Sequence, residues 1–165
     1  MARIENFGVT ASGQEVLRIS LRSEALSIAV LTLGAVLQSV RLNGVAYDLT
    51  IGSEKVADYQ GAMGYHGSII APVVNRISGA AAVVAGQRAA FQPNFLGKHC
   101  LHSGDLGTQH HLWDIADSSD DHVTLALHLP DGLGGFAGNR DVKARFSLHR
   151  ARLQLDIIAR SDAPT

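Results

Sequence analysis

An arginine near the middle of the chain could hydrogen-bond a polyhydroxylated ligand. Arg76 follows an apolar run over residues 68–74 and lies between Asn75 and Ile77. We expect this run to form a buried strand with Arg76 at its end, where the fixed guanidinium fork can donate to paired hydroxyls. The alternative is a structural arginine that pairs with a carboxylate such as Asp105.

A histidine in a turn of small residues is the second candidate. His102 lies in residues 101–104, which read Leu-His-Ser-Gly. A histidine before such a turn can present its ring to a ligand, with backbone N–H groups beside it. The alternative is a core or turn histidine satisfied within the protein, which is the commoner role of a lone histidine.

Side chains that bind metals also gather in this part of the chain: His99, Cys100, His102, His110 and His111. On a strand Cys100 and His102 would share a face, and His110 or His111 could complete a tetrahedral site. However, the spacing lacks the C-x-x-C or H-x-x-x-H pairs of metal sites, and no acidic residue is an obvious partner for the rings. We therefore expect no bound metal and no cofactor.

Other patterns argue against further kinds of chemistry. The glycine-rich residues 131–138 lack both the Lys-Ser/Thr pair and the helix start of a phosphate-binding loop. Trp113 lies in an alternating segment and is expected in the core rather than against a sugar ring. No G-x-S-x-G sequence is present, so acyl transfer has no support.

The hydrophobic pattern has a period of two, which is typical of half-buried strands. The alternating runs cover residues 45–51, 123–129, 142–148 and 153–157. Asn43-Gly44 predicts a type I′ hairpin turn, because both central residues of that turn need positive φ. Residues 86–87 and 151–152 predict two further hairpin connections.

Many short strands joined by tight turns predict an all-β fold, an antiparallel β-sandwich that forms one domain over residues 1–165. Three glycine-rich loops, residues 58–68, 93–111 and 130–139, hold most of the candidate site residues. This arrangement is typical of function carried by loops on a rigid scaffold.

The composition narrows the possible partners and location. Hydrophobic residues make up 46% of the chain and the net charge is −1, so we expect neither nucleic acid nor a membrane as partner. Cys100 is the one cysteine and fits a reducing compartment. The N-terminal residues lack the apolar stretch of a secretory signal. We therefore expect a cytoplasmic location.

Taken in order, ten segments resemble the N-terminal half of the aldose 1-epimerase (galactose mutarotase) family, from about residue 30 to the last residue. They are Gly34-Ala35, Gly52, Tyr59, residues 75–79 (Asn-Arg-Ile-Ser-Gly), Asn94, residues 101–104, Leu112-Trp113, Asp131-Gly132, Gly138 and residues 162–165 (Asp-Ala-Pro-Thr). The resemblance implies the large mutarotase-like β-sandwich. It also implies an isomerase of carbohydrate metabolism that interconverts the α and β anomers of hexoses such as galactose and glucose.

The resemblance also assigns roles to the candidate residues. Asn75, Arg76 and His102 correspond to residues that bind the sugar, with His102 in an accessory catalytic role. The sequence departs from the family pattern at residues 71–72, where Ala-Pro replaces Gly-Arg, and at Ser103 and Ala137, where Gly and Pro are frequent. These departures could mark a subgroup with a different substrate preference.

The rest of the family's machinery is expected beyond Thr165. The Thr-Asn-His segment with the general-acid histidine should begin just after this residue, and the general-base glutamate lies further on. The sheet would then be incomplete at its C-terminal end, which favours a homodimer or other self-association through an exposed edge. Besides the epimerase we consider two hypotheses: a non-catalytic carbohydrate-binding β-sandwich module, and a small β-barrel metal site of the cupin type.

Overall fold

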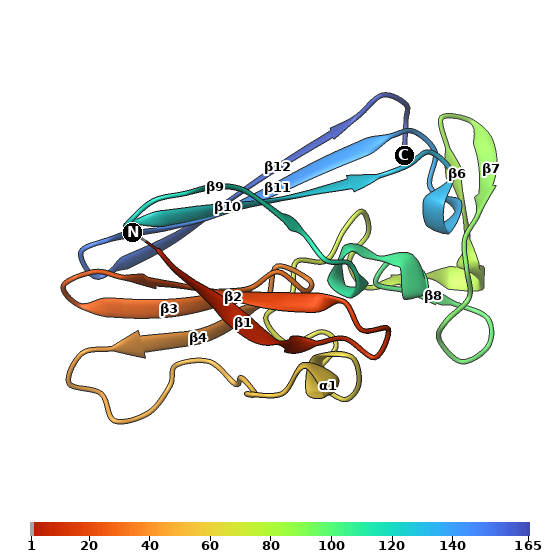
Figure 1. Ribbon diagram of the computed structural model, residues 1–165. Helices are drawn as coiled ribbons and strands as arrows, with labels where there is room; N and C mark the ends of the chain where they lie inside the picture. Colours follow the sequence, from red (N-terminus) through yellow and green to blue (C-terminus); the bar gives the residue numbers. More distant parts are fainter. Residues whose placement is uncertain (1) are drawn as a thin grey trace.

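The structure, a computed structural model that describes residues 2–165, contains two four-stranded antiparallel sheets packed face to face (Figure 1). The first sheet has the order β1-β2-β3-β4, and its strands are β1 (Arg3–Val9), β2 (Glu15–Arg22), β3 (Leu26–Leu31) and β4 (Leu37–Leu42). The second has the order β12-β11-β10-β9, and its strands are β9 (Asp114–Ser118), β10 (His122–Leu129), β11 (Arg140–His149) and β12 (Arg152–Ser161). The predicted antiparallel sandwich is confirmed.

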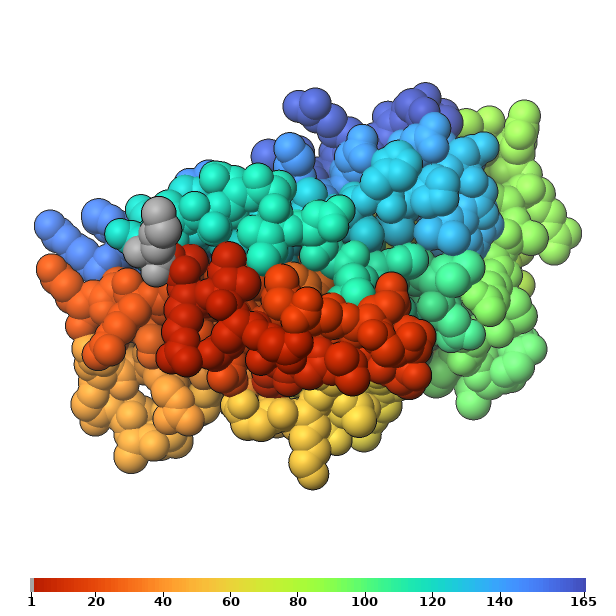
Figure 2. Space-filling view, viewed as in Figure 1, coloured from red at the N-terminus to blue at the C-terminus, as the bar shows by residue number. Residues whose placement is uncertain are grey.

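Shorter elements connect and extend the two sheets. They are the helix α1 (Val56–Tyr59), the paired strands β5 (Arg76–Ile77) and β8 (Cys100–Leu101), the hairpin β6 (Ala81–Val84) and β7 (Gln87–Ala90), and the 3-10 turns Ser78–Ala80, Gly104–Leu106, Thr108–His110 and Leu133–Gly135. The space-filling view shows the sheets in contact along the sandwich, with the segment around residues 80–110 stacked against one end (Figure 2).

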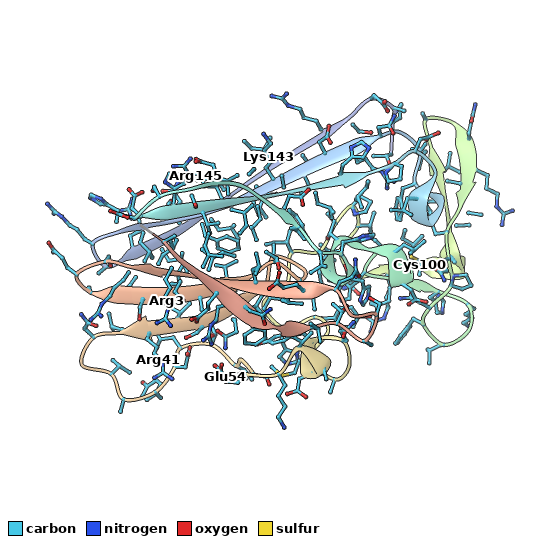
Figure 3. The ribbon with its side chains drawn as sticks, in the orientation of Figure 1. Arg3, Arg41, Glu54, Cys100, Lys143 and Arg145 are labelled. Atoms are coloured by element: carbon cyan, nitrogen blue, oxygen red, sulfur yellow. The ribbon has the colours of Figure 1, made fainter. Side chains whose placement is uncertain are left out.

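Alternation of apolar and polar residues produces the core between the sheets. On β11, Val142, Ala144 and Phe146 are buried while Lys143 and Arg145 between them are exposed. Both charged side chains lie on the face of the sheet turned away from the first sheet (Figure 3). The buried residues of β11 pack with apolar side chains of β2, β3 and β10, and this confirms the strands predicted at residues 123–129 and 142–148.

Two of the predicted hairpins form, with their turns one residue earlier than expected. Ala85 and Gly86 connect β6 to β7 with φ of 49° and 81°. Both central residues thus have the positive φ of a type I′ turn. Arg150 and Ala151 join β11 to β12, and of these two residues only Arg150 has positive φ, 53°.

The strand predicted at residues 45–51 is wrong. A turn does form, since the N–H of Val45 donates to the carbonyl of Leu42, but only Gly44 has positive φ and no strand follows. The side chains of Tyr47 and Ile51 are 68% and 78% exposed, so the alternation does not correspond to a core-facing side.

At residues 45–51 a side chain makes hydrogen bonds in place of a second strand beside β4. The Asp48 carboxylate accepts the backbone N–H of Val40 at 2.9 Å and the hydroxyl of Thr50 at 2.9 Å, and it also bonds the hydroxyl of Ser39. Burial raises the pKa of Asp48, but these hydrogen bonds outweigh it and lower the pKa to about 2. An aspartate that takes the backbone N–H of the neighbouring strand competes with regular pairing.

His122 forms a charge cluster at the β9–β10 turn. Its Nε2 lies 2.8 Å from Asp117 and its Nδ1 lies 3.0 Å from Asp121. The bond to Asp117, then that to Asp121, raises the pKa of His122. The cluster therefore contributes stability that is fully present below about pH 6.5, the unfolded value, and is lost as pH rises through the raised folded pKa.

We expect His122→Asn to lower the free energy of unfolding more at pH 6 than at pH 9. Urea unfolding of both proteins at the two pH values measures this difference. His149→Asn, at the exposed end of β11, is the matched control. An equal effect of His122→Asn at both pH values would contradict stabilisation by the charged form of His122.

Candidate functional site

The candidate residues meet in the two-stranded ladder at one end of the sandwich. β5 pairs with β8 so that Arg76 lies opposite Leu101 and Ile77 lies opposite Cys100, whose position Figure 3 labels. This register places Asn75 and His102, one residue outside each strand, next to each other. The structure therefore brings together the three residues selected from the sequence.

Asn75 and His102 are joined by two reciprocal hydrogen bonds. The N–H of Asn75 donates to Nδ1 of the His102 ring at 3.0 Å, and the N–H of His102 donates to the carbonyl of Asn75 at 2.9 Å. Both residues have positive φ, 68° and 51°. This left-handed backbone is uncommon outside glycine and is often found at functional sites.

The hydrogen bond at Nδ1 determines what His102 can do chemically. A ring nitrogen that accepts a hydrogen bond carries no proton, so the neutral ring of His102 carries its proton on Nε2. Partial burial, and then the positive charge of Arg76, lower the pKa of His102 and favour this neutral form. His102 is thus a hydrogen-bond donor through Nε2–H and has no free basic nitrogen.

Arg76 is anchored on one side and lacks a carboxylate partner. Its Nη1 donates to the side-chain oxygen of Asn75 at 2.7 Å, and its Cζ lies 4.5 Å from the centre of the Phe95 ring. Among residues 2–165 no carboxylate lies within ion-pair distance of Arg76, and Asp105 accepts instead from Gln92. The pairing with Asp105 considered from the sequence does not form, so the remaining N–H groups of Arg76 are available to a ligand.

The strand predicted before Arg76 is wrong. Residues 68–74 are irregular, and the side chain of Val74 is 64% exposed. Hydroxyl groups bond this segment in place of a neighbouring strand. The hydroxyl of Ser103 accepts the N–H of Val73 at 2.8 Å and donates to its carbonyl, and the hydroxyl of Thr108 accepts the N–H of Ala71 at 2.8 Å.

Three further residues surround the site and were not selected from the sequence. The ring of Tyr65 lies 4.7 Å from that of His102, Phe95 lies beneath Arg76, and the buried Gln109 donates to the carbonyl of His102 at 2.9 Å. All three come from glycine-rich loops, whose path the sequence pattern does not define. A single aromatic or amide residue in such a loop belongs to no motif of defined spacing, so the sequence does not mark it as a site residue.

Among the described residues, no group of three or more His, Cys, Asp or Glu side chains is arranged to hold a metal ion. His99 instead accepts the N–H of Gly79 through Nδ1 at 3.1 Å, and the thiol of Cys100 is buried. We expect elemental analysis of protein purified without an affinity tag to find no stoichiometric transition metal. About one zinc ion per chain would contradict this expectation.

Residues 17–165 match the sequence profile of the family described as aldose 1-epimerase, so the chain belongs to this family. The resemblance recognised in the sequence is therefore confirmed.

Individual relatives agree with this assignment. An aldose 1-epimerase of Haemophilus influenzae is 32% identical over 109 residues, which cover 66% of this chain and 31% of that protein. A galactose mutarotase of Mus musculus is 24% identical over 158 residues, which cover 94% of this chain and 46% of that protein. The crystal structure of a galactose 1-epimerase from Lactobacillus acidophilus superimposes with a TM-score of 0.83 at 23% identity, over 98% of this chain and 49% of that one. The chain thus spans about half the length, or less, of these proteins.

No helix in residues 2–165 is long and apolar enough to cross a bilayer.

Proposed function

We propose that residues 1–165 supply the sugar-orienting part of an aldose 1-epimerase, an isomerase that interconverts the α and β anomers of aldohexoses such as galactose and glucose. Family membership supports the class of reaction. The observation that carries the proposal is the pair of hydrogen bonds between Asn75 and His102 beside Arg76. This arrangement presents a guanidinium and an imidazole Nε2–H, which are suitable donors for sugar oxygens.

His102 has an accessory role in this proposal. Mutarotation requires a base that removes the proton of the anomeric hydroxyl and an acid that protonates the ring oxygen. Because Nδ1 of His102 is occupied and Nε2 carries a proton, the residue can orient the sugar but cannot act as the base. We assign the general acid and the general base to residues outside 1–165.

A second candidate function is a non-catalytic carbohydrate-binding module. One observation favours it: within residues 2–165, no carboxylate is bonded to the side chains of Arg76 or His102. The reading frame beyond Thr165 distinguishes the two candidates. A downstream Thr-Asn-His segment followed by a late glutamate favours the enzyme, and a frame that ends without them favours the module.

The product of the complete reading frame provides the test of activity. We expect it to accelerate mutarotation of α-D-galactose or α-D-glucose, and Arg76→Ala and His102→Ala to reduce the second-order rate constant kcat/KM strongly. Full activity in both variants would contradict the proposed roles. Failure of the complete product to accelerate either sugar would contradict the proposed reaction.

We further propose that the chain forms one domain and works in the cytoplasm without a cofactor. A cytoplasmic location is supported by the single cysteine, Cys100, which is free and buried. Free thiols are stable in the reducing cytoplasm.

Self-association is expected for residues 1–165 in isolation. Within residues 2–165, β12 has one hydrogen-bonded neighbour, β11, and its residues Leu155, Ile157 and Ile158 are 43%, 53% and 56% exposed. An unpaired apolar edge strand is a template for pairing with another chain, most simply as a twofold dimer.

Light scattering at micromolar concentration tests this expectation. We expect a dimer or larger species, and Ile157→Lys should shift it toward the monomer. A stable, well-folded wild-type monomer would contradict self-association through this edge.

A further inference from the structure

Tyr65 is placed against His102 by a loop that is fixed to the first sheet. The carbonyl of Gly67 accepts the N–H of Leu37 at 2.9 Å, at the start of β4. Gly67 has φ of +68°, and a Cβ atom at this position would lie 2.6 Å from the carbonyl oxygen of Leu37. Only glycine fits this close approach, so the path of the loop that carries Tyr65 is well defined.

The contact between the two rings is close, and it leaves the tyrosine hydroxyl free of partners in the described chain. The ring centres of Tyr65 and His102 are 4.7 Å apart with a tilt of 51°, and the Tyr65 ring also faces His110 edge-on at 6.4 Å. No hydrogen bond within residues 2–165 reaches the hydroxyl of Tyr65, whose contacts are those of its ring, and the residue is 43% exposed. The ring, rather than the hydroxyl, therefore makes the contact with the site.

We propose that Tyr65 is a positioning residue for His102, whose ring it holds in the orientation that offers Nε2–H to the sugar. The Asn75 N–H fixes one edge of the imidazole, but a single hydrogen bond still allows the ring to rock about that contact. A packed aromatic ring restricts this motion and excludes water from one face of the imidazole. That the ligand is a sugar rests on the proposed function. The contact between the rings of Tyr65 and His102 does not depend on it.

The first test needs no sugar. The ring protons of His102 are followed by NMR during a pH titration of the wild type, Tyr65→Ala and Tyr65→Phe. Because the Tyr65 ring shields His102 from water, we expect Tyr65→Ala to raise the pKa of His102 toward its ordinary value and Tyr65→Phe to leave it unchanged. Tyr47→Ala, at a 68% exposed tyrosine in the 45–51 segment, is the matched control and should have no effect.

The second test measures the affinity for D-galactose with the same proteins. Loss of one aromatic contact is expected to weaken binding by about two- to tenfold in Tyr65→Ala, and Tyr65→Phe should restore it. If Tyr65→Phe binds as weakly as Tyr65→Ala, the hydroxyl contacts the sugar directly and the positioning role is wrong. It is also wrong if Tyr65→Ala changes neither the pKa nor the affinity. If the wild type binds no galactose while the pKa of His102 still responds to Tyr65→Ala, the positioning role stands and the proposed ligand fails.

Discussion

Residues 1–165, added to a fresh solution of α-D-galactose, are expected to leave the rate of mutarotation at its uncatalysed value. A positioned general acid or base typically contributes ~10²–10⁴-fold to a rate. In the proposed function, residues 1–165 supply neither of these groups. Its one site histidine has Nδ1 occupied by the Asn75 N–H, so it cannot take up the anomeric proton. Polarimetry at several protein concentrations measures the rate.

The His102→Ala variant is the control for this experiment. A rate that rises in proportion to the concentration of wild-type protein, and that falls to the background in His102→Ala, would contradict the prediction. It would mean that an acid and a base are present within residues 1–165 or come from a second copy of the chain. Equal rates with and without protein would support an orienting role alone.

Arg76→Ala is expected to have the second largest effect, on the affinity for D-galactose. Hydrogen bonds from a charged group contribute about 1.5–3 kcal/mol, so the dissociation constant should increase by about 10- to 150-fold. Arg76→Lys should recover only part of this loss, because an ammonium group cannot reproduce the paired N–H groups of the guanidinium fork. Titration calorimetry provides the dissociation constants.

Arg88→Ala is the matched control, since Arg88 is an exposed arginine on β7 outside the site. We expect its affinity to equal that of the wild type. If Arg76→Ala also binds galactose as tightly as the wild type, Arg76 does not contact the sugar. If Arg88→Ala weakens binding to the same degree, the effect of Arg76→Ala is one of overall charge.

Strands of the second sheet could be predicted because one physical rule produces them. Strands that bury one face require alternating residues, and β10 and β11 follow this rule except at Arg140, a charged residue in a buried position of β11. The same rule failed at residues 45–51, where Asp48 takes the backbone N–H of Val40 and the apolar side chains remain exposed. Periodicity alone cannot detect a side chain that competes for a backbone hydrogen bond.

The site was accessible to sequence analysis only where its residues form a motif. Arg76 and His102 were selected for their residue types beside an apolar run and a turn of small residues, the family pattern added Asn75, and the structure brings the three together through the β5–β8 ladder. Tyr65 and Phe95 were not identified, because contacts across irregular loops depend on backbone paths that local sequence does not define. The buried strand expected before Arg76 failed for a related reason: the hydroxyls of Ser103 and Thr108 bond that segment instead of a strand.

A polar hollow elsewhere on the molecule is a competing place for a sugar to bind, which makes a direct test possible. It has a volume of about 620 Å³ and lies over the first sheet between residues of β1 to β4 and the segment after β4. Arg3, Arg18, Arg41 and Glu54 are among its lining residues, and Figure 3 labels three of them, Arg3, Arg41 and Glu54, on the side of the molecule away from β12. A sugar bound there would contact neither Arg76 nor His102.

Mapping the binding of D-galactose by NMR is the most direct test of the sugar-orienting role. The backbone amides, the arginine Nε–H groups and the histidine rings of isotope-labelled residues 1–165 are followed during a titration with the sugar. We predict saturable shifts that concentrate at Asn75, Arg76 and His102 and that require a correspondingly higher galactose concentration in Arg76→Ala. Saturable shifts that concentrate instead at Arg3, Arg18 and Arg41, or no shifts at millimolar galactose, would contradict the account.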